Sequence, residues 1–318
     1  MELMFDLLVQ GLQMCLVVAI APLVTGMTRK VRARLLRKQG ASVWQPYRDL
    51  LRLTRKEVVL AENASWLFRA VPYLVFSFTW VAAALVPTFA TGLQFSWSAD
   101  LIAIVALLGS ARFFLALAGM DVGTSFGGIG SSREMMIAAL AEPAMMLVVF
   151  SLALLAGSTQ LSTVIAFLSG PGVGLRVSLG MALVALIIVA LAENARIPVD
   201  NPSTHLELTM VHEAMVLEYS GRHLAMIELA SALKLVLYLS LLAALFVPYG
   251  VAGPGRSAGA HVLGLIFYFA KMALGAGALA IFEVSIAKMR VFRVPELLGA
   301  ALMLALLGTL LLFVSRSL

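Results

Sequence analysis

Eight apolar segments, each long enough to cross a lipid bilayer, constrain the fold of this chain more than any other feature. A membrane-spanning helix needs about 20 predominantly apolar residues. We place the segments at residues 4–28, 67–91, 99–121, 135–157, 174–193, 223–247, 261–283 and 297–315. Because the connections between them are short, we predict an all-α polytopic membrane protein. Residues 1–318 would form a single transmembrane domain, a bundle of about eight helices with amphipathic cytoplasmic loops and no separate soluble domain.

Composition supports this class and excludes others. The chain is 61% hydrophobic and 13% charged, whereas soluble domains are about 45–50% apolar. Its single cysteine, Cys15, excludes an internal disulfide and any zinc or iron–sulfur site built from this chain's cysteines alone. The net charge of +6 does not indicate nucleic-acid binding, because most basic residues lie in one short loop.

That basic loop predicts the orientation in the membrane. Between Arg29 and Lys56 there are ten basic residues, opposed only by Asp49. By the positive-inside rule this loop is cytoplasmic, so both termini face outward and residues 193–222 are cytoplasmic too. The same loop contains PYRDLLRLTRKEVVL, in which apolar and basic residues alternate in a way that suits a helix in the interfacial plane. A simple basic anchor on anionic lipid is the alternative.

Ionisable side chains inside the apolar segments are costly in lipid and usually mark ion or proton pathways. Pro143 cannot donate to the carbonyl of Ala139, so a kinked helix beside Glu142 gives water and protons a place in the membrane. Glu228 and Lys234 are six residues apart, about 240° around a helix, and need partners from elsewhere. Structural ion pairs between helices are the alternative. We predict a proton pathway through Asp121, Glu142, Glu193, Glu228, Lys234, Lys271 and Glu283, and through Arg112, to which we assign no partner.

Two polar connections stand out. The segment from Glu193 to Arg222 combines carboxylates, histidines and prolines, and we expect a short helix from about Ser203 or Thr204. Its carboxylates favour docking or proton entry, whereas a metal site at His205 and His212 has little support. The sequence VGTSFGGIGSSRE over residues 122–134 lacks a phosphate-loop pattern, and we expect a flexible hairpin.

Three motifs in order resemble the subunit 1 family of respiratory complex I. The first loop carries WQPYRDLLRL-x-RKE, the fifth segment ends in AENARIPVD, and EYSG follows, while a carboxylate lies in the fourth segment. The matching residues are Gln45, Pro46, Asp49, Leu50, Lys56, Glu57, Glu142, Glu193, Arg196, Pro198, Asp200, Glu207, Leu208, Glu218, Tyr219, Ser220 and Gly221. Within this family, SFGGIGSSRE and RLTRKE look like the membrane subunits of formate-hydrogenlyase-type (group 4) membrane-bound [NiFe]-hydrogenases.

The resemblance implies a non-catalytic subunit that anchors a cytoplasmic redox arm and couples it to ion translocation. Implied partners are a hydrogenase large subunit, an iron–sulfur small subunit and antiporter-like membrane subunits, in the cytoplasmic (inner) membrane of a prokaryote. The [NiFe] centre and iron–sulfur clusters are expected in those partners, with no cofactor, metal or catalytic residue in this chain. The expected docking loops carry Gln45, Asp49, Lys56, Glu57, Arg133, Glu134, Arg196, Asp200, Glu207, Glu213 and Glu218.

Two other functions stay open at this point. The first is the quinone-site subunit of a complex I-type NADH or ferredoxin:quinone oxidoreductase. The second is a stand-alone secondary transporter, which predicts inverted repeats with broken helices in both halves; no such symmetry is visible in the sequence.

Overall fold

The computed structural model describes residues 2–92, 96–170, 176–196, 211–253, 258–286 and 293–317. Over these ranges the chain is a bundle of helices, and isolated β-bridges join Ala90 to Ala252 and Asp100 to Gln160 at helix connections. The predicted all-α membrane fold is confirmed.

Seven helices in the described ranges are long and apolar enough to cross a membrane. They are α1 (Glu2–Leu35), α3 (Trp66–Leu85), α4 (Leu101–Asp121), α5 (Ser125–Ala156), α10 (Gly221–Phe246), α11 (Ala258–Ser285) and α12 (Val294–Ser317). The remaining predicted segment, the fifth at residues 174–193, corresponds to α7 (Val177–Glu193), whose 17 residues extend only about 25 Å. That is shorter than the ~30 Å hydrocarbon core, so the C-terminal end of α7 can lie at membrane depth.

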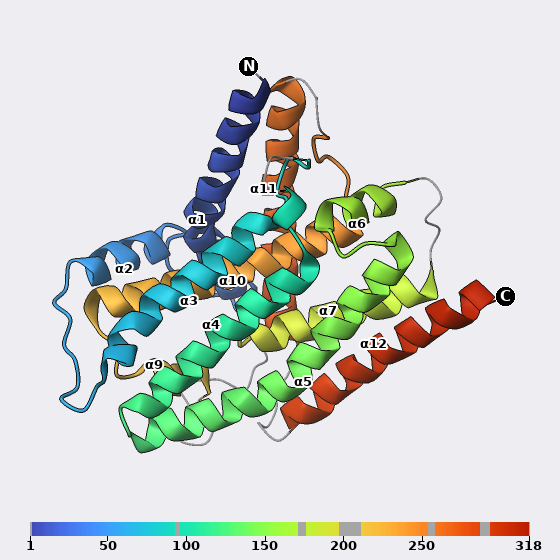
Figure 1. The fold of residues 1–318 in the computed structure, drawn as a ribbon. Coiled ribbons are helices and arrows are strands. Elements are labelled where there is room, and N and C mark those ends of the chain that lie inside the picture. The colour runs from blue at the N-terminus through green and yellow to red at the C-terminus, as the bar shows by residue number, and fades with distance from the viewer. Residues whose placement is uncertain are drawn as a thin grey trace.

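Small buried residues let the helices approach one another closely. In Figure 1, α1 and α11 stand side by side, steeply inclined to α3, α4 and α5, while α12 runs alongside α5. Ala141 and Ala144 on α5 and Ala182 and Ala185 on α7 are fully or almost fully buried. Helix association in lipid depends on such close van der Waals packing, because lipid tails are as apolar as leucine.

Four short helices complete the described ranges: α2 (Gln45–Thr54), η1 (Ser96–Ser98), α6 (Leu161–Leu168) and α9 (His212–Val216). The amphipathic helix predicted in the basic loop is confirmed as α2, with Pro46 buried in its first turn and Arg48 and Arg52 exposed. It packs against α1 and α10, and the Tyr47 hydroxyl donates to the carbonyl of Ala19. The helix expected from Ser203 or Thr204 lies outside the described residues.

The predicted hairpin at residues 122–134 is wrong, because α5 already begins at Ser125. The Thr124 hydroxyl accepts from the backbone N–H of Gly127 and caps the helix. A side chain at Gly127 would meet the carbonyl oxygen of Gly119, and one at Gly130 would meet α9. The glycines therefore belong to a helix whose close packing outweighs their low helix propensity.

Candidate functional site

Three carboxylates surround one buried guanidinium near the middle of the bundle. Arg112 lies on α4 with only 5% of its side chain exposed. Its Nη2 forms an ion pair with Oε1 of Glu193, at the end of α7. Its Nε lies 3.4 Å from Oε1 of Glu134, and its Nη1 lies 3.4 Å from Oε1 of Glu142, both on α5. Sequence reasoning assigns Arg112 no partner, and the structure gives it three.

Lys234 on α10 completes this set, with its Nζ 3.6 Å from Oε2 of Glu193. We call Arg112, Glu134, Glu142, Glu193 and Lys234 the Arg112 network. Four helices contribute to it, and its ion pairs join three carboxylates to two cations. Such a network can hold an additional proton or attract an additional cation, because one negative charge in a low-dielectric interior is poorly compensated.

The prediction that Glu134 lies in a docking loop is wrong. This residue is buried on α5, two turns before Glu142, and its carboxylate faces inward to Arg112. The signal was available, since residues eight apart on one helix lie on similar faces. The glycine-rich sequence before Glu134 favours a loop, and a loop gives no reason to place Glu134 on the same helix as Glu142.

A second ion cluster lies where α1, α7 and α11 meet. Glu283 on α11 is buried, with its Oε2 3.3 Å from Nη1 of Arg32 and its Oε1 3.1 Å from Nη1 of Arg196. Arg196 lies just beyond the end of α7 and directly follows Ala195, which has a positive φ of 50°. The short segment from Glu193 to Arg196 thus connects the two clusters: the carboxylate enters the Arg112 network and the guanidinium binds Glu283.

A polar pocket of about 160 Å³ opens between α1, α2, α9 and α10. Charged side chains line it from all four elements and from the end of α7: Arg29, Asp49, Arg196, Glu213 and Glu228. His212, Ile227 and Ser231 also line a smaller cavity of about 30 Å³, whose other walls include Arg112, Glu134 and Lys234. The pocket and the Arg112 network are therefore separated by little more than these three shared residues.

Two groups on α9 at this pocket have displaced pKa values. Burial lowers the pKa of His212, while Glu134 opposes and Lys234 reinforces the change. Burial, together with Glu228, raises the pKa of Glu213, and Arg29 opposes that rise. The pocket therefore contains a carboxyl with a raised pKa, Glu213, directly after a histidine with a lowered pKa, His212.

The EYSG motif, residues 218–221, fixes the loop between α1 and α3 to the rest of the bundle, and we call it the EYSG clamp. Tyr219 stacks on Phe68, with ring centroids 4.0 Å apart, and its hydroxyl donates to the Phe68 carbonyl at 3.1 Å. Within α3 that carbonyl has no N–H donor four residues on, because the residue there is Pro72. The Ser220 hydroxyl binds both the backbone N–H and the carbonyl of Val59 at 2.8 Å.

Other predicted pathway residues have local structural roles. Asp121 accepts from the backbone N–H of Ser65 at 2.9 Å, which ties the end of α4 to the start of α3. Lys271 donates to the carbonyl of Val247 at 2.6 Å, at the end of α10. Over the described ranges, neither residue forms an ion pair with the Arg112 network. Glu228 is exposed and lines the polar pocket.

The remaining described residues predicted to dock the redox arm lie on α2, α5 and α9 or in the connections beside these helices. Asp49 accepts from the Gln45 side chain at 3.0 Å and pairs with Arg52. Four of these residues are exposed: Lys56, Glu57, Glu213 and Glu218. Arg133 is partly buried on α5. Asp200, Glu207 and His205 lie outside the described residues. In the part of the chain that the structure describes, no group of three or more His, Cys, Asp or Glu is placed to hold a metal ion.

These features define a polytopic helical membrane protein with a buried charge network beneath a polar, loop-covered face. The model of the NADH dehydrogenase family matches residues 8–314, so the chain belongs to that family. Two relatives in Escherichia coli (strain K12) are especially similar. Formate hydrogenlyase subunit 4 is 31% identical, over 93% of this chain and 95% of its own length. Hydrogenase-4 component C is 36% identical, over 76% of this chain and 75% of its own length.

A more distant relative and one solved structure agree with this assignment. An NADH-quinone oxidoreductase subunit of Anaplasma phagocytophilum (strain HZ) is 26% identical over 70% of both chains. A chain of the membrane-bound sulfane sulfur reductase, an archaeal respiratory membrane complex, superposes with a TM-score of 0.81. The match covers 96% of this chain and 99% of that chain at 18% identity, which establishes a shared fold.

Proposed function

We propose that this chain is the membrane subunit of a complex I-like [NiFe]-hydrogenase of the formate hydrogenlyase type, which anchors the redox arm and carries protons beneath it. The observation that carries the mechanism is the Arg112 network, in which three carboxylates and two cations meet next to a polar pocket. Similarity to formate hydrogenlyase subunit 4 and hydrogenase-4 component C supports the type of complex. The electron-transferring [NiFe] and iron–sulfur centres belong to partner subunits in this proposal.

The redox arm docks on the face formed by α2, α9 and the EYSG clamp. Exposed charges of both signs gather there, including Arg48, Lys56, Glu57 and Glu218. Because Ser220 and Tyr219 bind the first loop and α3 directly, a displacement of this face is transmitted to the start of α10. By the positive-inside rule this face is cytoplasmic and both termini are outward.

Protons enter at the polar pocket and reach the Arg112 network past His212. Glu213 and Glu228 receive them, and His212 lies between the pocket and the buried cavity. Within the network, a shift of Arg112 or Lys234 toward or away from Glu193 changes how well each carboxylate is compensated. Redox-driven motion of the docking face would therefore change proton affinity at membrane depth.

The test neutralises two members of the network together, with Glu142→Gln and Lys234→Met, in the assembled complex in inverted membrane vesicles. We expect hydrogen evolution from a reduced viologen to persist while the number of protons translocated per hydrogen falls. A matched control, Glu62→Gln with Arg69→Met, removes one carboxylate and one cation from exposed positions near α3. Unchanged coupling in the network variant would refute the pathway.

A quinone-site function is the second candidate, favoured by the similarity to an NADH-quinone oxidoreductase subunit, and the polar pocket is where it would reside. The described walls of that pocket enclose about 160 Å³, below the roughly 300–1,000 Å³ of typical ligand pockets. Quinone-site inhibitors are therefore expected to leave hydrogen evolution by the complex unchanged. Inhibition that is lost when pocket residue Asp49 is replaced would favour the quinone function instead.

A further inference from the structure

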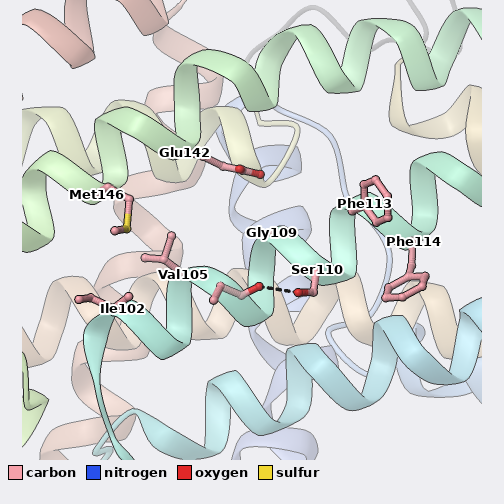
Figure 2. Close-up of a pocket in the computed structure, with 9 residues that line it drawn as sticks. Ile102, Val105, Gly109, Ser110, Phe113, Phe114, Glu142 and Met146 are labelled. Atoms are coloured by element: carbon pink, nitrogen blue, oxygen red, sulfur yellow. Dashed lines mark hydrogen bonds between the residues drawn. The ribbon is translucent and has the colours of Figure 1, made fainter.

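An open groove of about 450 Å³ runs along the outer face of α4 and α5. Figure 2 shows its apolar walls, with Ile102 and Phe113 on α4 and Met146 on α5, and the Glu142 carboxylate reaching into it above Gly109. Both helices are long and apolar enough to span the membrane. In the isolated chain this groove would face lipid.

Glu142 is the least enclosed carboxylate of the Arg112 network. Its side chain is 44% exposed, compared with 12% for Glu134 and 5% for Glu193. At 1.5 Å per residue it lies about 25 Å from the Ser125 end of α5 and about 21 Å from the Ala156 end. That depth is close to the centre of a bilayer, where a carboxylate facing hydrocarbon costs at least a few kcal/mol.

The Arg112 network has one more carboxylate than it has cations, so a further positive group would balance its charge. Arg112 and Lys234 face three carboxylates, and Lys234 contacts the network through Glu193 rather than through Glu142. Among the described residues, Glu142 forms one ion pair, with Nη1 of Arg112 at 3.4 Å, and Arg112 is shared with Glu134 and Glu193. A positive side chain entering the groove would balance the network. Lipid headgroups do not reach this depth, and acyl chains provide no charge.

The floor of the groove suits a helix. Ala106 and Ser110 are four residues apart and Gly109 lies beside them, which gives a small-residue surface where helix backbones approach closely. The Ser110 hydroxyl donates to the Ala106 carbonyl at 2.8 Å and so has its own partner. A side chain at Gly109 would lie 3.4 Å from Oε1 of Glu142, so the glycine also leaves space beside the carboxylate.

We propose that this groove seats a transmembrane helix of a neighbouring membrane subunit, which brings a lysine or arginine side chain to Glu142. The inference rests on the proposed function in one respect, that the chain works within a multisubunit membrane complex. The neighbouring cation completes the Arg112 network, and the ion pair carries the charge coupling from this chain to the next subunit.

The first test places a photo-crosslinking amino acid at Ile102 or Phe113 in the complete complex in native membranes. We expect a crosslink to a different membrane subunit, mapped by mass spectrometry to a transmembrane helix within one turn of a Lys or Arg. The same probe at Leu274, an exposed position on α11, serves as the comparison and should give a different product. Crosslinks only to lipid, to a second copy of this chain, or to a helix with no cation would overturn the inference.

A second test fills the floor with Ala106→Leu. We expect about a tenfold loss of the neighbouring membrane subunit from the purified complex, with the redox subunits retained. Ala300→Leu, which makes the same change at an exposed position on α12, should retain both. Full retention of the neighbour in Ala106→Leu would refute the groove as its seat. Purification of the wild-type chain without redox subunits would instead refute the proposed function.

Discussion

Replacing Arg112 with leucine should destabilise this chain more than any other single charge removal. The guanidinium is almost fully buried and forms ion pairs with three carboxylates. At 3.4 Å and an effective dielectric constant of about 20, the contacts with Glu134 and Glu142 each supply a gross attraction of roughly 5 kcal/mol, most of which desolvation cancels. Removing one partner from a buried ion pair costs about 3–5 kcal/mol net, because the remaining charge stays buried.

The free energy of unfolding can be measured by SDS titration of the detergent-solubilised chain, followed by tryptophan fluorescence. Arg112→Leu should lower it by about 3–5 kcal/mol, and adding Glu193→Gln should recover about 0.5–3 kcal/mol, since a carboxylate that has lost its partner is removed as well. Arg112→Lys should be intermediate, because one ammonium cannot replace a fork that binds three carboxylates. Exposed Arg69→Leu, the matched control, should change stability by no more than about 0.5 kcal/mol. If Arg112→Leu unfolds with the wild-type free energy, the network is not a connected unit.

Three further predictions concern the face covered by the loops. Tyr219→Phe should cost about 1–3 kcal/mol of unfolding free energy, measured by the same titration, because it leaves the Phe68 carbonyl without a donor; a loss below about 0.5 kcal/mol would contradict this. Gly221→Ala should cost at least about 1–3 kcal/mol and expose the first loop to protease, since Gly221 has a φ of 54° and an added Cβ would lie 2.6 Å from a loop carbonyl oxygen. As its control, Gly128→Ala on α5 adds the same methyl group where the backbone is helical and no atom lies within 4 Å, and should stabilise the chain by about 0.5–1 kcal/mol. Burial lowers the pKa of His212, so the contribution of the neutral imidazole to stability is present above about pH 6.5 and is lost as pH falls through the lowered folded pKa. His212→Gln should therefore flatten the dependence of the unfolding free energy on pH between about 7.5 and 5.5. Equal slopes in the variant and the wild type would show that His212 does not cause this pH dependence.

The fold class could be predicted because a bilayer imposes one length on every spanning helix. The amphipathic α2 was equally readable, since its basic and apolar residues recur at helical spacing and Pro46 suits a first turn. The start of α5 could not be predicted from propensity. Four glycines favour a loop, yet three of them, Gly127, Gly128 and Gly130, are in α5, where Gly127 packs against α4 and Gly130 against α9.

The candidate site was predictable in its residue types and only partly in its geometry. Burying a charge in lipid is so costly that Glu142, Glu193 and Lys234 stood out from sequence alone. The pairing of Arg112 with the two carboxylates, and of Lys234 with Glu193, depends on how α4, α5, α7 and α10 pack against one another, and no local sequence pattern encodes that packing. The same limit explains Lys271 and Asp121: both are ionisable residues in apolar helices, yet their partners are the Val247 carbonyl and the Ser65 N–H.

The central claim is that this chain anchors a hydrogenase, and metal analysis of the complex tests it most directly. The complex is solubilised gently, purified through a tag on this chain and assayed for nickel and iron. We predict stoichiometric nickel together with a larger amount of iron, both contributed by co-purifying subunits. Iron without nickel would contradict the claim and indicate a quinone-reducing relative of complex I.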